Sequence, residues 1–385
     1  MQRGLAGHYL PISSTGEKAR AFVPAPLPPK PPLTLTGPLE TLLDSASVAL
    51  GRLDGLSLLL PDPRLFLYTY VRKEAVLSSQ IEGTQSSLSD LLKHEFKNTP
   101  TAIEADVTEV SCYVAAMELG LARLREGAPL SLRLLREIHA CLLSHGRGSS
   151  KEPGEFRRSQ NWIGGSRPGN ATFVPPPPDA LLEALGALEK FLHDDPVKTR
   201  PLVKAALAHV QFETIHPFLD GNGRLGRLLI TLLLCAEGIL SQPLLYLSLH
   251  FKEHRSEYYR LLQHVRLTGD WEEWLEFFLQ GVVRTAESAT LTARRLLDLF
   301  QNDREKLHGE SATVLRLHAQ LQQKPVLSVS AAARELGVTH PTATKALRTL
   351  DQKQIVSEIT GSDYRRVYTY THYLKILNEG ESTLD

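Results

Sequence analysis

The sequence is poor in cysteine and has no excess of charge of either sign. Its 385 residues include only three cysteines, Cys112, Cys141 and Cys235, and none of them belongs to a C-x-x-C pair. This pattern indicates neither a disulfide scaffold nor a cysteine zinc site. The 43 basic and 43 acidic residues cancel, so no global positive field draws the chain to nucleic acid or to an anionic membrane. A local basic patch is still compatible with this balance.

Long apolar segments are also missing. The most apolar stretch, residues 228–236, is too short to cross a bilayer. The first residues contain no apolar core of a secretion signal. Together with the small number of cysteines, these absences predict a cytoplasmic protein with no membrane partner. The length of the chain suggests two or three domains.

The first hundred residues divide into a proline-rich arm and a helical region. Six prolines between positions 24 and 32 exclude a helix and predict an extended arm over residues 1–38, which we expect to lie over the next domain. Over residues 39–100, apolar side chains recur at three- and four-residue spacing, which predicts helices. One of these should run from about residue 64 to 77, and Glu82 follows near its end. The helix dipole disfavours a carboxylate there, so Glu82 requires a cationic partner or has a function.

The rest of the chain is mainly helical, with one interruption and a different tail. Within residues 101–290, two short extended runs around 165–169 predict a β-hairpin. We expect one helix over 271–288 and a separate linking helix within 291–310. Residues 311–385 show the order helix, turn, helix, hairpin, which predicts a winged helix-turn-helix domain.

A single stretch between two apolar helices gathers most of the reactive side chains. It runs from His216 to Arg227 with the sequence H-P-F-L-D-G-N-G-R-L-G-R. Pro217 disfavours helical backbone at His216, so the preceding helix should end there. The helix that follows is apolar on all sides, as a buried central helix is. We therefore expect the reactive residues in a short loop held between two core helices, a suitable place for preorganised chemistry.

The residue types in this loop suit a polyphosphate. Residues 221–223, Gly-Asn-Gly, can adopt backbone conformations in which successive N–H groups converge on an anion. Arg224 and Arg227 share a helix face and add two fixed charges. Asp220 is a hard oxygen ligand suited to Mg²⁺, and His216 titrates in the range of a general base. The loop contains no Walker G-K-S/T sequence and the chain no H-E-x-x-H helix, which argues against both a P-loop and a metallohydrolase of that type.

The stretch His216–Arg227 matches the motif of the Fic family, H-P-F-x-D/E-G-N-G-R-x-x-R, at every fixed position. The chain resembles that family over about residues 5–290. Residues 78–83, S-S-Q-I-E-G, look like the family's inhibitory motif, S/T-x-x-x-E-G/N, and precede the core as in the class with an N-terminal inhibitory helix. The resemblance implies a mainly α fold, in which a Fic helical-bundle core over 101–290 carries a β-hairpin flap and is followed by the winged-helix domain.

The resemblance also implies a protein adenylyltransferase. Such an enzyme transfers AMP from ATP to a Ser, Thr or Tyr hydroxyl of a target protein and releases pyrophosphate. His216 would be the catalytic base and Asp220 would hold Mg²⁺. Residues 160–165 and 173–177 look like the flap that pairs with the target as an added strand. The residues expected at the nucleotide are Gly221, Asn222, Gly223, Arg224, Arg227, Asn161, Trp162, Ile163, Gly164, Gln211 and Tyr258.

The inhibitory motif gives Glu82 a specific role under the same resemblance. Its carboxylate would pair with Arg227 and compete with the γ-phosphate of ATP for the guanidinium. Ser78, one turn earlier, would tie the helix end to the loop, and Gly83 would end the helix. The protein would then be self-inhibited.

Other functions stay open at this stage. The same residues could run the reaction in reverse and remove AMP from a modified protein, with Glu82 positioning a water. A regulator whose Fic domain senses nucleotide is another alternative, although an intact His216 favours chemistry, because a sensor needs no base. The target protein could be the chain itself, and a homodimer is compatible with the sequence.

The tail has two open interpretations. The helix expected over Thr342–Leu350 could bind DNA, with Lys345, Arg348, Arg365 and Arg366 as phosphate contacts. The domain could instead serve in dimerisation or in docking a target, since its basic charge is modest.

Overall fold

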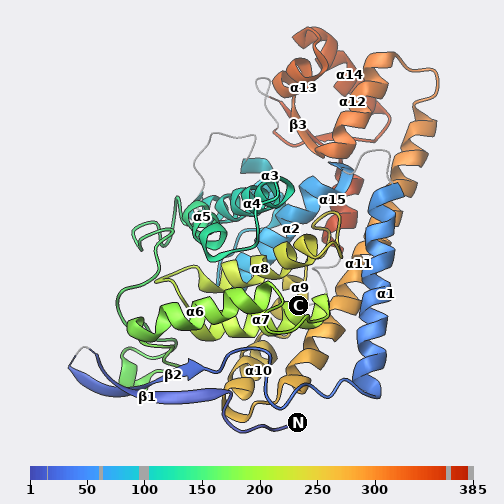
Figure 1. Ribbon diagram of the computed structural model, residues 1–385. Helices are drawn as coiled ribbons and strands as arrows, with labels where there is room; N and C mark the ends of the chain where they lie inside the picture. The colour runs from blue at the N-terminus through green and yellow to red at the C-terminus, as the bar shows by residue number, and fades with distance from the viewer. Residues whose placement is uncertain (15, 60–63, 95–103, 361–365, 380–385) are drawn as a thin grey trace.

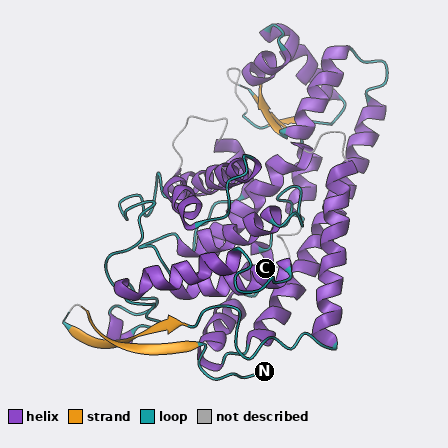
Figure 2. Ribbon diagram, viewed as in Figure 1, coloured by secondary structure: helices purple, strands orange, loops and turns teal. Residues whose placement is uncertain are grey.

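The structure, a computed structural model, describes residues 1–14, 16–59, 64–94, 104–360 and 366–379, and these are mainly helical (Figure 2). The α-helices are Pro38–Leu59 (α1), Arg64–Ile81 (α2), Leu88–His94 (α3), Glu104–Arg125 (α4), Leu132–Leu142 (α5), Pro178–Leu192 (α6), Pro201–Ile215 (α7), Asn222–Ala236 (α8), Ser248–Glu253 (α9), Arg255–Thr268 (α10), Trp271–Lys306 (α11), Ala312–Gln323 (α12), Val329–Leu336 (α13), His340–Gln352 (α14) and Thr371–Asn378 (α15). The strands are Gly7–Ser14 (β1), Glu17–Pro24 (β2), Val326–Ser328 (β3), Ser357–Glu358 (β4) and Val367–Thr369 (β5). Within these ranges, no helix combines the length and the apolar character that crossing a bilayer requires.

Helices α7 and α8 form the centre of the fold, as their apolar sequences predict. Every residue of α7 after Pro201 is buried, and so are nearly all residues of α8 up to Leu234. The two helices pack against each other, α6, α10 and α11 cover α7, and α2, α4 and α5 cover α8. The loop from His216 to Gly221 joins them, so the reactive stretch is supported on both sides by the core.

The N-terminal arm lies against the core, but it is a β-hairpin rather than a single extended segment. Strands β1 and β2 pair antiparallel from Gly7–Pro24 to Ser14–Glu17. The Phe22 N–H donates to the Val174 carbonyl at 2.8 Å, which fixes the hairpin beside the flap. Ahead of it, the Arg3 guanidinium makes two bonds, of 2.7 and 2.6 Å, to the Glu272 carboxylate. Strand pairing was missed because the proline cluster that follows, from Pro24 to Pro32, dominates the local pattern, and β1 itself contains Pro11.

Helix α11 corrects the predicted linking helix. It is one continuous helix of 36 residues, Trp271–Lys306, with no break near 289–290. Ala289 is fully buried, and Thr290 donates its hydroxyl to the Ala286 carbonyl at 2.8 Å, so both residues fit within the helix. Helix α1 packs beside α11 along much of its length (Figure 1). Alanine is a strong helix former and threonine only a modest one, so the local sequence does not oppose continuity, and packing against α1 supports it.

The flap and the tail differ from their predicted forms in detail. The flap is closed by one antiparallel bridge, Ile163 to Phe173, with a 3₁₀ turn at Pro168–Asn170 between them, so the two predicted extended runs pair at one position but do not continue as strands. In the tail, helix Val329–Leu336 is confirmed, and α12, β3 and α15 were not anticipated. The three strands form an antiparallel sheet in the order β3-β5-β4, and the predicted hairpin turn at 361–365 lies outside the described residues. The winged-helix assignment stays a prediction.

Candidate active site

The loop after α7 turns sharply at His216 and is closed by an asparagine. His216 ends α7 with left-handed backbone angles, φ 49° and ψ 62°. Asn222 accepts from the Phe218 N–H at 2.9 Å and donates to the Phe218 carbonyl at 2.8 Å. Gly221 also has a positive φ, 73°, and leads directly into α8. The first N–H groups of α8 therefore face the concave side of the loop without intrahelical partners.

His139, on α5, supports the loop, and the sequence did not indicate this role. The ring of His139, on α5, stacks on Phe218 with 3.7 Å between centroids and 11° between planes. Its Nδ1 accepts from the Gly154 N–H at 2.8 Å, so its Nε2 carries the proton and donates to the Asp220 carbonyl at 2.9 Å. Burial lowers the pKa of His139 to about 4, which keeps this tautomer neutral. Only the packing of α5 against the loop shows this role.

Two residues of the preceding segment bind the loop backbone. The Arg157 guanidinium donates to the His216 carbonyl at 2.9 Å. The Asn161 amide donates to the Phe218 carbonyl at 3.1 Å. Asn161 was expected at the nucleotide, but the structure directs its amide to the loop backbone instead, because the flap crosses close behind Phe218.

The imidazole of His216 is held in its neutral form. Burial is the main reason that its pKa is lowered, to about 3, and the charges of Arg157 and Arg266 add to the effect. Its Nδ1 is buried and has no hydrogen-bond partner among the described residues. A neutral imidazole is the protonation state that a general base needs.

Glu82 lies directly over the arginines of the loop. Its carboxylate contacts Arg227 Nη2 at 2.8 Å and Arg224 Nε at 3.0 Å. Ser78 accepts from Arg227 through both its hydroxyl, at 2.8 Å, and its backbone carbonyl, at 2.9 Å. Burial alone would raise the pKa of Glu82, but Arg227, Arg224 and Arg147 together lower it below its ordinary value. A Cβ on Gly223 would lie 2.6 Å from Glu82 Oε1, so this approach requires a glycine. Gly83, with φ 102°, follows at the helix end as expected.

The carboxylate of Glu109, on α4, is a second partner of Arg224 that sequence reasoning missed. Glu109 Oε1 lies 2.7 Å from Arg224 Nη1, and both side chains are buried. Arg147 lies 3.6 Å from Glu82 and from Glu109 and closes the cluster at the surface. No local pattern marks Glu109, since α4 carries it on an otherwise ordinary amphipathic helix.

A cavity of about 530 Å³ opens beside the loop. Glu82 lines it, whereas Arg224 and Arg227, the two cations that Glu82 contacts, do not. The lining residues are Glu82, Trp162, Ile163, Gly164, Thr172, Phe173, Glu213, His216, Leu219, Asp220, Gly221, Asn222, Gly223, Tyr259, Leu262, Gln263 and Arg266.

Two of the residues expected at the nucleotide lie elsewhere. Tyr258 is fully buried, and its hydroxyl bonds to His209 at 2.8 Å, so Tyr259 is the tyrosine that lines the cavity. Gln211 donates its amide to the Ala25 carbonyl at 2.9 Å and holds the N-terminal arm. Both errors have the same cause: helical spacing shows which residues share a face but not which neighbour that face meets.

Glu213 and Arg266 add buried charge at the far side of the cavity. Glu213 precedes His216 by one turn, and burial raises its pKa to about 7. The guanidinium of Arg266 lies over the Phe173 ring, 3.8 Å from its centroid. The cavity therefore has an aromatic and partly polar end beyond His216 and an anion-binding end at the loop.

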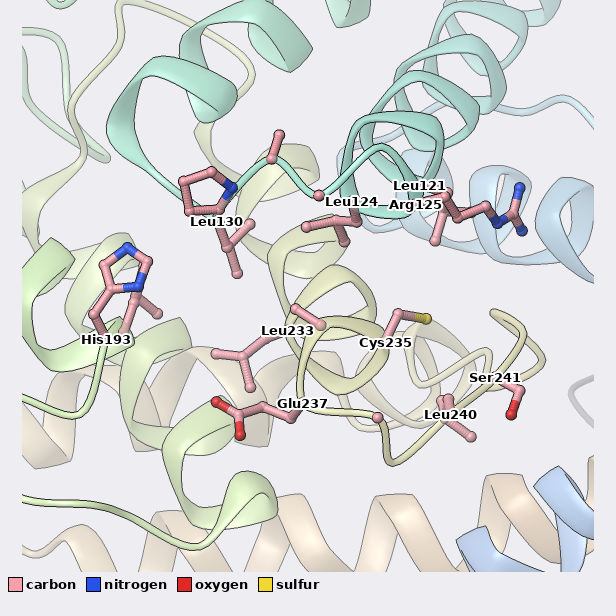
Figure 3. Close-up of a pocket in the computed structure, with 16 residues that line it drawn as sticks. Leu121, Leu124, Arg125, Leu130, His193, Leu233, Cys235, Glu237, Leu240 and Ser241 are labelled. Atoms are coloured by element: carbon pink, nitrogen blue, oxygen red, sulfur yellow. The ribbon is translucent and has the colours of Figure 1, made fainter.

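A second cavity lies away from this chemistry (Figure 3). It has a volume of about 470 Å³ and lies between the ends of α4, α6 and α8. Cys235 lines it, but burial raises the pKa of this thiol to about 12, so it is not a reactive cysteine. The first cavity is the candidate active site.

The site combines a neutral histidine with a glycine loop and two arginines that follow it on α8, a set of groups suited to phosphate. Two family profiles match the chain: "Fic/DOC family N-terminal" over residues 40–122 and "Fic/DOC family" over residues 129–234. The chain therefore contains these two domains of the Fic/DOC family.

Similar proteins carry the same family name. The chain is 29% identical over 212 residues to "Protein adenylyltransferase Fic" of Drosophila erecta, a match that covers 54% of this chain and 39% of that protein. It is 36% identical over 159 residues to the protein of that name from Aedes aegypti, covering 41% and 29%. The chain thus spans well under half the length of these relatives. A Fic family protein from Desulfovibrio desulfuricans G20 has the same fold, with a TM-score of 0.57 and 22% identity over 89% of this chain and 98% of that one.

The support from His139 predicts a specific pH dependence of stability. The pKa of its side chain is about 4 in the folded chain and about 6.5 in a model peptide, so the unfolded chain binds the extra proton between these values. Folding stability therefore falls as pH decreases from 6.5 to 4. His139→Phe keeps a ring on Phe218 and removes the titrating group. We expect the variant to lose less stability across this window, by up to about 1.4 kcal/mol per pH unit.

Urea unfolding at half-unit pH steps from 4 to 7.5 measures this difference. His145→Ala, at an exposed histidine close to α5, is the matched control and should keep the wild-type slope. Equal slopes for His139→Phe and wild type would show that His139 does not titrate as the structure indicates.

Proposed function

We propose that the chain is a self-inhibited protein adenylyltransferase. It would transfer AMP from ATP to a hydroxyl side chain of a target protein. The observation that carries this proposal is the place of Glu82, which covers the two arginines of an anion-binding loop beside a neutral histidine. The names of the relatives from Drosophila erecta and Aedes aegypti support the same activity.

In the proposed reaction, His216 accepts the proton of the target hydroxyl. The oxygen attacks the α-phosphate of ATP, the bond to the β-phosphate breaks, and pyrophosphate leaves. The first N–H groups of α8 and the side chains of Arg224 and Arg227 balance the phosphate charge. The pKa of His216 is low in the structure, about 3, and the negative charge of a bound triphosphate would raise it toward the range of an effective base.

Asp220 fits the role of a Mg²⁺ ligand. Its carboxylate lines the cavity beside the loop, and its Oδ1 accepts from the Gly221 N–H at 2.6 Å, which fixes its orientation. Asp220 would hold the metal, which would supply positive charge to offset that of the phosphates. Asp220 also lies 3.5 Å from Arg224, so the site already balances this carboxylate with a cation.

Inhibition follows from competition for the same guanidinium groups. While Glu82 contacts Arg224 and Arg227, neither of these arginines lines the cavity, so neither would be available to hold the γ-phosphate. The triphosphate would then lie with its α-phosphate out of line for attack. Removal of AMP from a modified protein by the same residues is the runner-up, with Glu82 positioning a water molecule.

We expect Glu82→Gly to raise the transfer of α-labelled AMP to protein by roughly tenfold or more, because it frees both arginines for phosphate. His216→Ala in the Glu82→Gly background should lower the transfer by about 10² to 10⁴ fold, as for the loss of a general base. The measurement is labelling of lysate proteins with α-labelled and γ-labelled ATP, and only the α-label should transfer.

Glu126→Gly is the matched control, since Glu126 also follows the end of a helix and precedes a glycine, but it is exposed and pairs only with a surface arginine. It should label like wild type. Equal labelling by wild type, Glu82→Gly and the His216→Ala double variant would contradict the proposed transfer.

We expect Asp220→Asn to raise the Mg²⁺ concentration needed for half-maximal labelling, tested in the Glu82→Gly background. The amide keeps the shape of the carboxylate but loses its charge, which a hard cation requires. Asp195→Asn, in an exposed loop, serves as the control. Labelling that persists in excess EDTA would argue against a metal at this site.

The tail is proposed as a DNA-binding unit, supported by the exposure of Lys345 and Arg348 on α14. Thr339 caps this helix through a bond to the Thr342 N–H. Arg365 lies outside the described residues. Arg348→Ala should reduce the slope of log affinity against log salt by about one. Fluorescence anisotropy with duplex DNA measures this slope, and wild-type affinity that is insensitive to salt would contradict the proposal. A homodimer and a cytoplasmic location stay predictions of the sequence.

A further inference from the structure

We propose that Lys73 and helix α15 are positioning elements of self-inhibition, which hold helix α2 where Glu82 reaches the active-site arginines. The inference rests on the proposed function, because its consequence is the release of Glu82. It gives the C-terminal part of the chain a role in the activity of the core.

Helix α2 connects two distant parts of the molecule. Its C-terminal end carries Ser78 and leads into Glu82, both of which contact Arg227. Lys73 lies nine residues before Glu82, which corresponds to about 13 Å along a helix. A straight helix transmits a shift at Lys73 to its end, so the position of Glu82 depends on what holds the middle of α2.

The middle of α2 is held by the last helix of the described chain. Lys73 is only 2% exposed, and its Nζ donates to the Leu377 carbonyl at 2.7 Å. Leu377 lies in the final turn of α15, where carbonyls lack intrahelical partners and the helix dipole is negative. Lys73 therefore caps α15. One turn earlier, the hydroxyls of Thr69 and Tyr373 lie 3.3 Å apart, and both residues are fully buried.

Other contacts of α2 are made with the core. Tyr70 donates its hydroxyl to the Ala289 carbonyl of α11 at 2.8 Å. Glu74 bonds to the Ser248 hydroxyl at 2.5 Å, and burial raises the pKa of Glu74 to about 7. Helix α2 thus presents a row of buried polar side chains, each matched to a different element. These contacts constrain the position of α2, because a buried polar group that loses its hydrogen-bond partner costs free energy.

A pocket lies beside the first half of α2. It has a volume of about 370 Å³, lies between α2, α4 and α12, and is lined by Leu67, Tyr68 and Val71 among others. Lys73 follows Val71 by two residues, so its bond to Leu377 adds a contact to α2 close to this pocket.

Strand β5 connects α15, which accepts the bond from Lys73, to the three-stranded sheet of the tail. It ends at Thr369 and α15 begins at Thr371, with only Tyr370 between them. Tyr370 donates to Asp303 of α11 at 2.7 Å. A ligand that displaces β4 and β5 would therefore displace α15 and loosen its hold on Lys73.

Labelling with α-labelled ATP tests the inference on the full chain. Lys73→Met keeps the apolar stem and removes the charged donor. The bond to Leu377 and the contact of Nζ with the Tyr246 ring, 4.8 Å from its centroid, are both lost, so we expect labelling to rise about tenfold. Lys73→Arg keeps a cationic donor and should stay near wild type. Lys375→Met, at an exposed lysine of α15, is the matched control. In the Glu82→Gly background, Lys73→Met should not raise labelling further, because the inhibition that it releases is already absent.

The outcomes separate this inference from the proposed function. If Glu82→Gly itself gives no labelling, the proposed function fails. If Glu82→Gly labels but Lys73→Met equals wild type, or raises labelling by the same factor in both backgrounds, the positioning role is overturned. Tyr373→Phe, a smaller change that removes the neighbouring contact with the Thr69 hydroxyl, guards against misfolding and should raise labelling in the same direction. Faster hydrogen exchange of the α2 amides in Lys73→Met, at an unchanged melting temperature, would support the role; unchanged exchange would overturn it.

Discussion

The buried contact of Glu82 with Arg224 and Arg227 is the interaction on which the rest of the structure depends. Both guanidinium groups are withdrawn from water, and a buried charge is tolerated only with an opposite partner. Glu82 meets that requirement in this structure, and a triphosphate would meet it during the proposed reaction. The same physical need explains why a carboxylate of the chain occupies the site and why a phosphate group would suit it.

The two sides of this contact differ in how they are held. The loop is supported by His139 and Arg157 and closed by Asn222, all through its own backbone. Glu82, in contrast, is carried at the end of one helix whose middle is bound by Lys73 to the C-terminal helix. The loop is thus held through its own backbone, whereas the position of Glu82 depends on the contacts of one helix. Under the proposal, control of activity acts on α2.

Patterns that depend on neighbours in the sequence were predicted well. The apolar pattern and Pro217 predicted the buried helices α7 and α8 and the loop between them. The helix dipole predicted that Glu82, at a helix end, contacts a cation. Predictions that depend on tertiary packing were wrong. The Tyr258 hydroxyl bonds to His209 in the core, the Gln211 amide bonds to the N-terminal arm, and α11 is one continuous helix. These depend on how helices pack, and a helical face carries no mark of the neighbour that it meets.

The sequence by itself predicted the chemistry of the loop, because a base, a hard oxygen ligand, glycines and two arginines stand within one short segment. The resemblance of residues 78–83 to the inhibitory motif pointed to Glu82 as its competitor. Tertiary structure alone decided which other side chains join them. Glu109 comes from α4, His139 from α5 and Lys73 from the middle of α2, each without a local signal. Each role arises because the packing of distant helices brings a buried polar atom within hydrogen-bond distance of its partner. The spacing of residues along the sequence does not give that distance.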